Sequence, residues 1–281
     1  MERIRPPAVA GSFYPSDAEE LSQIIEDCFL SNPLGPKRIK SPSPSLVGGM
    51  APHAGYMYSG PCAAHLYVCL DNSVGRVILL GVNHWGKGHR AALSPWDAWQ
   101  TPLGAVPVDQ KLNDFLATRI SFLKNDELAH LQEHSIEVQL PFLQRVVSDF
   151  TFAPISLSYL SVEECAKLGT AIAEVCDAEP RSERRTIILA SSDLNHYLSP
   201  EETDELDGLA LEKVLALDPA GLLNVVEKEN ISMCGALPTA VMLFAAAGLG
   251  AQQARLLKHC HSGDVSAMKN VVGYASVAVE L

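Results

Sequence analysis

The sequence predicts an α/β protein whose mainly parallel or mixed central sheet is flanked by helices on both faces. Three apolar runs, at residues 46–51, 76–81 and 185–190, carry almost no polar alternation, which is typical of strands buried on both faces. Segments with the spacing of amphipathic helices separate these runs, so strand and helix patterns alternate along the chain. Repeated β-α-β order of this kind favours a sheet covered by helices on both sides.

The individual elements follow from the spacing of apolar residues, which repeats about every 3.6 residues in a helix and about every 2 in a strand. We expect helices at residues 17–30, 61–70, 109–118, 133–147, 162–176, 200–217, 219–228 and 236–247. We expect strands at residues 46–51, 76–81, 150–157, 185–190, 253–259 and 272–280. Pro141 falls inside the fourth helix, where a missing N–H should kink it.

One stretch, residues 31–45, has the composition of a linker and is rich in Pro, Ser and Lys. We expect it to be a surface loop rather than a domain boundary, because too few residues precede it to build a separate core. The sequence therefore predicts a single domain over residues 1–281.

Composition narrows the class of protein further. The chain is 47% hydrophobic and 19% charged, as is ordinary for a globular protein with a large core. Its formal net charge of -12 disfavours nucleic acid or an anionic membrane as the main partner, because phosphate binding needs clustered Lys and Arg. No apolar run has the length of a bilayer span, and the first residues lack the apolar core of a signal peptide. Seven cysteines without a CxxC pair argue against a disulfide framework, so we expect a cytoplasmic protein.

Histidines follow the buried strands at equivalent places. His53, His84 and His196 each come shortly after one of the three apolar runs. If these strands are parallel neighbours, their carboxyl ends meet at one edge of the sheet and the three imidazoles share a cleft. Imidazole is the commonest protein ligand for zinc, iron and copper. A single strand-end histidine is more often a hydrogen-bonded loop residue, but its recurrence favours a shared site. Three other histidines are interpreted as structural residues: His65, His89 and His130.

The segment Glu133 to Glu137 reads Glu-His-Ser-Ile-Glu and is expected to open a helix. Two interpretations of it remain open. Acidic residues near the positive end of a helix dipole would account for both glutamates. Alternatively, His134 lies at the rim of the cleft as an acid, a base or a substrate contact.

Cys234 precedes a long apolar helix pattern. A thiol at a helix N-terminus has a lowered pKa, which makes Cys234 the strongest candidate for an anionic ligand or a nucleophile. The alternative, a small buried residue before the helix, is the better interpretation from spacing alone. Ser191, Ser192 and Asp193 are placed to orient His196.

A second candidate cluster lies at residues 259–264, which read His-Cys-His-Ser-Gly-Asp. His259 and His261 would share one face of a strand, although a partly exposed strand end is the preferred interpretation. Motifs of nucleotide-dependent enzymes and common hydrolases are absent from the sequence, namely GxGxxG, Walker A, GxSxG and HExxH.

Taken together, these segments resemble the MEMO family, which includes an animal cell-motility protein and many bacterial and archaeal members. The resembling motifs run in family order: AGSFY at 10–14, APHAGY at 51–56, LGVNH at 80–84, EHSIE at 133–137, SSD at 191–193 with His196, and Cys-Gly at 234–235. The resemblance implies a fold similar to class III extradiol dioxygenases, with a non-haem metal cleft.

The resemblance also implies roles for individual residues. By motif, the metal ligands are His53, His84 and Cys234, and the catalytic residues lining the cleft are His134, Asp193 and His196. The implied cofactor is iron as Fe²⁺, with copper or zinc as alternatives. The resemblance thus favours a ligand role for Cys234 over the buried-residue interpretation.

One departure from the family concerns Trp85. The animal protein has a His-His doublet where this chain has His84-Trp85. If the second histidine of that doublet is the ligand, this chain has either shifted to His84 or lost a ligand. A thiolate in place of the dioxygenase glutamate also changes the charge and redox behaviour of iron, which counts against ring cleavage.

Three functions are compatible with these observations. The first is a metal-dependent, dioxygenase-like redox enzyme acting on a small molecule. The second is a non-catalytic binding module that holds a peptide or metabolite in the same cleft, as the animal relative is associated with phosphorylated peptides. The third is a metal-handling protein. Bacterial and archaeal relatives tend to be encoded beside a radical-SAM protein, which implies a functional link to it.

Overall fold

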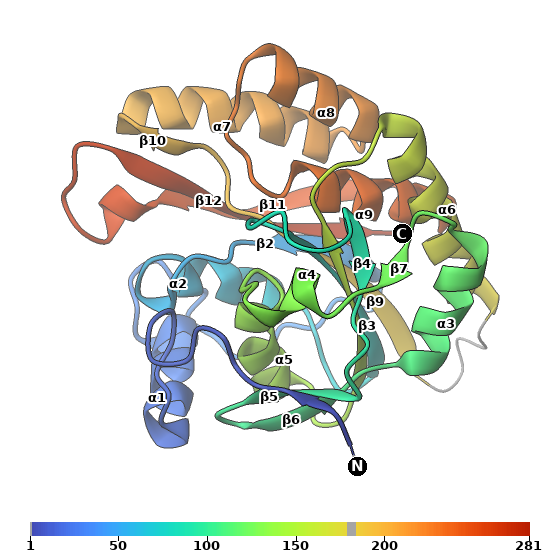
Figure 1. Ribbon diagram of the computed structural model, residues 1–281. Coiled ribbons are helices and arrows are strands. Elements are labelled where there is room, and N and C mark those ends of the chain that lie inside the picture. The colour runs from blue at the N-terminus through green and yellow to red at the C-terminus, as the bar shows by residue number, and fades with distance from the viewer. Residues whose placement is uncertain (1, 179–183) are drawn as a thin grey trace.

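The computed structural model describes residues 2–178 and 184–281, and it shows a mixed central sheet with helices on both faces (Figure 1). This architecture confirms the fold class that the sequence predicts. The strands are β1 Ile4–Arg5, β2 Leu46–Ala51, β3 Val74–Val82, β4 Ala91–Leu93, β5 Ala98–Thr101, β6 Gly104–Pro107, β7 Lys124–Asn125, β8 Thr151–Leu157, β9 Arg185–Ser191, β10 His196–Leu198, β11 Gln253–His261 and β12 Val271–Glu280. The helices are α1 Ala18–Leu30, α2 Tyr56–Tyr67, α3 Gln110–Arg119, α4 Leu128–Leu131, α5 Leu140–Val146, α6 Val162–Ala178, α7 Pro200–Leu215, α8 Pro219–Lys228 and α9 Ala236–Gly248, with 3₁₀ turns at Glu137–Gln139 and Ser262–Asp264.

The large sheet has a parallel centre and antiparallel flanks. Its strand order is β10-β12-β2-β9-β3-β8-β4-β7, and β11 pairs with β12. Strands β2, β9, β3 and β8 run parallel to one another, whereas β12 is antiparallel to β2 and β4 is antiparallel to β8. The carboxyl ends of β2, β9 and β3 therefore lie side by side at one edge of the sheet. A small separate sheet joins β1, β5 and β6.

Strand β3 shows why the central strands lack polar alternation. Ile78 and Leu80 enter a core beneath α3, α6, α7, α8 and α9. Val77 and Leu79 enter a second core on the opposite face, beneath α1, α2 and α5. All four side chains are fully buried, and each such burial stabilises the fold by about 1.5–3 kcal/mol. A strand buried on both faces needs apolar residues at every position.

Local side-chain caps set the starts of two helices that the sequence predicts, α1 and α7. The Asp17 carboxylate accepts hydrogen bonds from the backbone N–H groups of Glu19 and Glu20 at the start of α1. Ser199 and Glu202 cap each other's backbone at the start of α7. Such caps satisfy N–H groups that have no partner within the helix, which is why these two helices begin close to the predicted positions.

The helix predicted over residues 133–147 is wrong in its first half. Residues 133–134 are irregular and residues 135–136 form a turn, a 3₁₀ segment follows, and the α-helix begins only at Leu140. Pro141 lies in the first turn of α5, where its missing N–H needs no partner, so it starts a helix instead of kinking one. The Glu133 side chain accepts the backbone N–H groups of His134 and Ser135, and this local bonding competes with a helix.

Other boundaries also differ from the prediction. Helix α2 begins five residues before Pro61, at Tyr56, because the backbone N–H of Tyr56 is held by the carbonyl of Phe13. The short strands β1, β4, β5, β6, β7 and β10 were not predicted, since two to four residues carry too little periodicity. Residues 31–45, all of which are described, contain no helix or strand, and most are exposed or half-buried.

Candidate metal centre

Two histidines leave the sheet at its carboxyl edge, as the sequence predicts. His53 comes two residues after the end of β2, and His84 comes two residues after the end of β3. The register pairs Ala51 with Ser191 across β2 and β9, and Leu80 with Ala190 across β3 and β9. The parallel register therefore brings both histidines to the space above β9.

A third histidine joins them from a separate segment. His53, His84 and His134 each offer one ring nitrogen, and these three atoms lie within 4.8 Å of one another. The ring centroids are 5.1 Å apart for His53–His84, 5.4 Å for His53–His134 and 4.7 Å for His84–His134. Across residues 2–178 and 184–281, this is the one group of metal-binding side chains that converges so closely. We call these three residues the histidine cluster.

Burial lowers the pKa of two members of the histidine cluster, His53 and His134. His53 is 2% exposed, and its burial, followed by repulsion from His134 and His84, holds its pKa well below the ordinary value. Burial also lowers the pKa of His134 to about 4, although the charge of Glu133 opposes this shift. A neutral imidazole keeps a nitrogen lone pair, which is the form that binds a metal.

Glu133 orients two members of the cluster. Its Oε1 oxygen accepts from Nδ1 of His84 at 2.9 Å, and its Oε2 oxygen accepts from the His84 backbone N–H at 2.8 Å. Nδ1 of His134 lies 3.4 Å from Oε1. Burial raises the pKa of Glu133, but the His84 hydrogen bond and the two imidazoles together lower it to about 2. Because an ionised carboxylate only accepts, Nδ1 of His84 carries a proton and donates it, which leaves Nε2 as the ring nitrogen available to a metal.

Arg5 holds the loop that carries Glu133 and His134 in place through hydrogen bonds. This fully buried guanidinium donates to the carbonyl of Glu133 at 2.6 Å and to that of His130 at 2.8 Å. It also pairs with the Glu137 carboxylate at 2.6 Å and lies over the Trp99 ring. No pattern in the sequence predicts this arrangement, since Glu133 and Glu137 fit a helix start equally well.

Glycine 81 permits the close approach of that loop to the sheet. A Cβ added to Gly81 would lie 2.4 Å from Ile136 and 2.7 Å from the Ser135 hydroxyl. The Ser135 hydroxyl donates to the carbonyl of Val82 and accepts from its N–H. The loop can therefore lie directly on the end of β3, which places His134 beside His84.

Cys234 approaches the histidine cluster from the start of α9. Its Sγ lies 3.2 Å from Nε2 of His53 and 3.7 Å from the carbonyl of Asp193. Gly235 makes this approach possible, because a Cβ there would lie 2.3 Å from Ser192. A metal held at about 2.0–2.1 Å from nitrogen and about 2.3 Å from sulfur separates two adjacent donors by about 3.1–3.6 Å. The observed separation of Sγ and Nε2 suits two ligands of one ion.

The lowered pKa expected for Cys234 is wrong. Burial, and then the charge of Asp193, raise the pKa of this thiol well above its ordinary value. Desolvation and a like charge outweigh the helix N-terminus here. In the metal-free protein Cys234 is therefore a thiol rather than a thiolate, and a bound cation would be needed to draw its proton off.

The other predicted site residues lie close by but have different contacts. The Asp193 carboxylate accepts from the backbone N–H of His53 at 2.7 Å, and burial raises its pKa to about 6. His196 bonds through Nδ1 to the carbonyl of Ser232 at 2.9 Å and is not a member of the histidine cluster. The expectation that Ser191, Ser192 and Asp193 orient His196 is therefore wrong. They hold His53 and the start of α9 instead, through the pairs His53–Ser191, His53–Asp193 and Gly235–Ser192.

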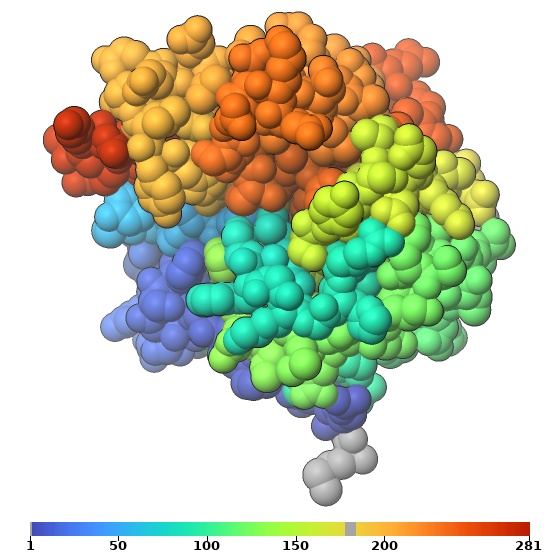
Figure 2. Space-filling model, turned by 45° about the horizontal axis from the view of Figure 1, so that its top comes forward, coloured from blue at the N-terminus to red at the C-terminus, as the bar shows by residue number. Residues whose placement is uncertain are grey.

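Trp85 does not enter the cluster. Its side chain is 61% exposed and its indole N–H donates to the carbonyl of Gln132 at 3.1 Å. Figure 2 shows the face of the molecule where the loop after β3 lies at the centre, next to the segment that follows β8. Of the two positions 84 and 85, the first is the one that contacts the other histidines.

The remaining histidines have structural partners, as expected. His65 bonds to the carbonyl of Leu34, His130 bonds to that of Ala92, and the backbone N–H of His89 donates to Asp126. In the second candidate cluster, His259 pairs with Asp207 at 2.9 Å and His261 lies 3.6 Å from Asp264. Cys260 faces the other way, into an apolar cluster with Cys62 and Tyr274. These residues converge on no common point.

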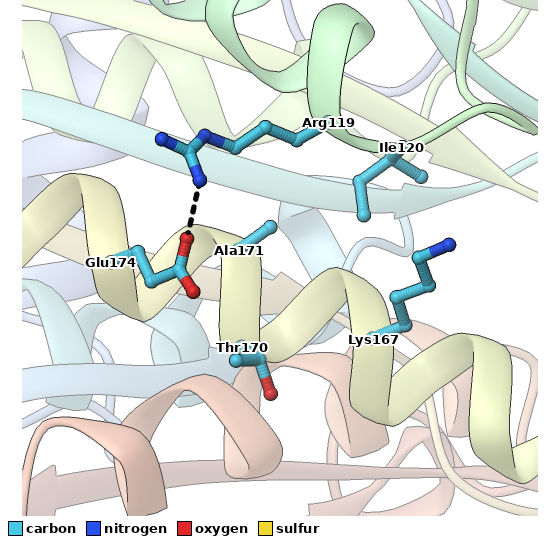
Figure 3. Close-up of a pocket in the computed structure, with 6 residues that line it drawn as sticks. All are labelled: Arg119, Ile120, Lys167, Thr170, Ala171 and Glu174. Atoms are coloured by element: carbon cyan, nitrogen blue, oxygen red, sulfur yellow. Dashed lines mark hydrogen bonds and ion pairs between the residues drawn. The ribbon is translucent and has the colours of Figure 1, made fainter.

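A surface pocket elsewhere has a different character. Figure 3 shows it between α3 and α6, with Arg119 paired to Glu174 at 2.9 Å. Its lining residues are Arg119, Ile120, Lys167, Thr170, Ala171 and Glu174. This set offers no group of metal-binding side chains, so the histidine cluster is the stronger candidate for chemistry.

Among the described residues, no helix has both the length and the hydrophobicity that crossing a bilayer demands. The cytoplasmic location stays a prediction.

Comparison with known proteins agrees with the motifs quoted above. A family model described as Memo-like protein matches residues 5–278. A MEMO1 family protein of Methanopyrus kandleri is 42% identical over 280 residues, covering 97% of this chain and 98% of the relative. MEMO1 family proteins of Ignicoccus hospitalis and Thermotoga neapolitana are 44% and 42% identical, covering 99% and 97% of this chain and 99% and 98% of those proteins. The chain therefore belongs to the Memo-like, or MEMO1, family.

Proposed function

We propose that the histidine cluster binds a metal ion and that the protein is a metal-dependent redox enzyme acting on a small molecule. The observation that carries this proposal is the convergence of three imidazoles from three separate segments. Nothing in the packing of a core requires three histidines to face one point, and burying polar groups without a partner is costly. A shared ion would give these nitrogens a common partner.

The donor set fits such an ion. His53, His84 and His134 supply borderline-soft nitrogen donors. The thiol of Cys234 lies outside this group but is 3.2 Å from Nε2 of His53. Fe²⁺ is the first choice for this set, with copper or zinc as alternatives. When bound, a redox-active ion of this kind would supply electrons and open coordination positions to a substrate and to O₂.

The residues around the ion would have distinct tasks. Glu133 holds the His84 ring, and Asp193 holds the backbone of His53. The Asp193 carboxyl, with its pKa raised to about 6, can hold or release a proton near neutral pH. We assign proton movement to Asp193 and His196, and we assign metal binding to His134 in addition to His53 and His84.

Metal content tests the proposal. Protein purified without oxygen or chelator should contain near-stoichiometric metal by mass spectrometry, and His84→Ala should lose it. Cys234→Ser should bind more weakly, because a hydroxyl is a poorer ligand than a thiolate. His65→Ala, which removes a histidine outside the cluster, is the matched control. A metal-free wild type after anaerobic reconstitution, or full occupancy in His84→Ala, would overturn the ligand assignment.

A second function draws support from the exposed aromatic residues beside the cluster. Trp85 is 61% exposed next to His84, and Tyr197 is 72% exposed next to His196. Tyr197 also has a φ of +65°, a strained conformation for a bulky residue. A non-catalytic binding module would use these rings to hold a peptide or metabolite near the histidine cluster. A ligand displaced by Trp85→Ala without any oxygen uptake would favour this function over the enzyme.

A further inference from the structure

The hydroxyl of Ser191 lies at a junction of three hydrogen bonds beneath His53. Its Oγ is 2.6 Å from the carbonyl oxygen of Ser135, 2.7 Å from Nε2 of Gln139 and 2.9 Å from Nδ1 of His53. Ser191, Gln139 and Ser135 are buried. No solvent-exposed alternative therefore competes for these bonds.

The direction of each bond follows from what each partner can do. The Ser135 carbonyl only accepts, so the single proton of the Ser191 hydroxyl must point to it. The Gln139 amide nitrogen only donates, so it occupies one Ser191 lone pair. One lone pair remains for His53, and Nδ1 of His53 must therefore carry a proton and donate it.

The Gln139 amide cannot be turned round to reverse this order. Its nitrogen also donates to the carbonyl of Pro52 at 3.0 Å, and its oxygen accepts from the Tyr67 hydroxyl. A flipped amide would bring two oxygens together at Pro52. Tyr67 is fully buried and stacks on Phe142 at 5.0 Å, so the chain of hydrogen bonds is anchored in the core.

We propose that Ser191 is a positioning residue that fixes His53 in the tautomer with the proton on Nδ1, so that the Nε2 lone pair faces the histidine cluster before any metal arrives. This inference rests on the proposed metal site, since it explains how that site is prepared. The role of Ser191 means that two histidines of the cluster are fixed by groups of different charge. A carboxylate fixes the His84 ring, whereas a neutral hydroxyl with an imposed proton direction fixes the His53 ring.

The tautomer can be read directly in the metal-free wild type by ¹⁵N NMR of the histidine side chains at about pH 8, where imidazole is neutral. We expect Nδ1 of His53 to have the shift of a protonated nitrogen and Nε2 that of an unprotonated one. His53→Gln identifies the signal. The opposite tautomer, with the proton on Nε2, would overturn the proposal.

Variants separate positioning from simple loss of a buried hydroxyl. Ser191→Ala should remove the preference of His53 for a proton on Nδ1. It should also weaken Co²⁺ binding by roughly 10- to 100-fold in an anaerobic optical titration. Ser191→Thr keeps a hydroxyl and should restore both readouts. Ser276→Ala is the matched control, because Ser276 is equally buried and donates to the Cys62 carbonyl outside the cluster. Ser191→Ala with an unchanged tautomer and affinity would leave Ser191 a purely structural residue.

The two proposals fail differently. If wild-type protein binds neither Co²⁺ nor iron, the proposed function fails, while the NMR spectrum still decides the tautomer. If metal binds and the proton of the neutral His53 ring is on Nε2, only the positioning role of Ser191 is wrong. Thermal melting of each variant shows whether it is folded, and the wild-type spectrum decides the tautomer even if Ser191→Ala fails to fold.

Discussion

Both oxygens of the Glu133 carboxylate are bonded to His84, one to the ring at 2.9 Å and the other to the backbone N–H at 2.8 Å. One carboxylate thereby fixes both the place and the rotation of a histidine at the end of β3. The arrangement resembles the carboxylate–histidine pairs that orient metal ligands. It leads to the first prediction.

Glu133→Gln should weaken metal binding by roughly 10- to 100-fold. The amide has one accepting oxygen in place of two, so either the ring or the backbone N–H of His84 loses its acceptor. A competitive metal titration measures the change. Glu127→Gln is the control, because Glu127 pairs with Arg3 on the surface. Equal affinity in both variants would show that Glu133 does not orient the ligand.

Trp85→His should leave metal content unchanged, even though it creates the His-His doublet of the animal protein. The side chain at this position points to the carbonyl of Gln132 and is largely exposed, so a histidine there would not reach the cluster. Mass spectrometry of the reconstituted protein measures the effect. Restored binding in the double variant His84→Ala/Trp85→His would contradict this expectation.

Arg5→Met should destabilise the fold by roughly 3–5 kcal/mol, because it leaves the buried Glu137 carboxylate without its cation. The double variant Arg5→Met/Glu137→Gln should recover part of this loss, since the uncompensated charge is gone. Urea unfolding measures both free energies. Arg3→Met removes the exposed pair with Glu127 and should cost less than about 1 kcal/mol. A similar small cost for Arg5→Met would contradict the role given to the buried pair.

His259 should make stability depend on pH. The hydrogen bond to Asp207 raises the pKa of His259 above 6.5, against the opposing effect of burial. A raised folded pKa means that the pair stabilises the protein fully below pH 6.5 and that this contribution is lost as the pH rises through the folded value.

The comparison that isolates this effect is wild type against His259→Gln. The difference between their unfolding free energies should shrink as the pH rises above 6.5. Burial lowers the pKa of His53 and His134, which makes the stability of both proteins change with pH in the opposite direction. Subtracting the two unfolding free energies removes this shared contribution. A difference that stays constant across this range would show that the pair carries no charge-dependent stability.

The long buried elements were predictable because their patterns are determined by the two faces of the sheet. Strand β2 was predicted over its exact bounds at residues 46–51, and β8, β9 and β12 lie within one residue of the prediction at each end. The non-helical segment at residues 133–136 was not predictable, since it depends on the Glu133 carboxylate accepting a hydrogen bond from His84, which lies 49 positions away in the chain. Propensity and spacing contain no information about such a distant partner.

Sequence alone determined the α/β class and the strand-end positions of His53 and His84, because apolar periodicity and chain order are local properties. Its motifs also carried the resemblance to the family. Only the tertiary structure decided which residues meet. The parallel register of β2, β9 and β3 brings two of the histidines together, and the turn held by Arg5 adds His134. Burial in the folded protein, and then the neighbouring Asp193, raise the pKa of the Cys234 thiol and outweigh the helix N-terminus. Desolvation and contact depend on what surrounds a side chain in space, which the order of residues does not state.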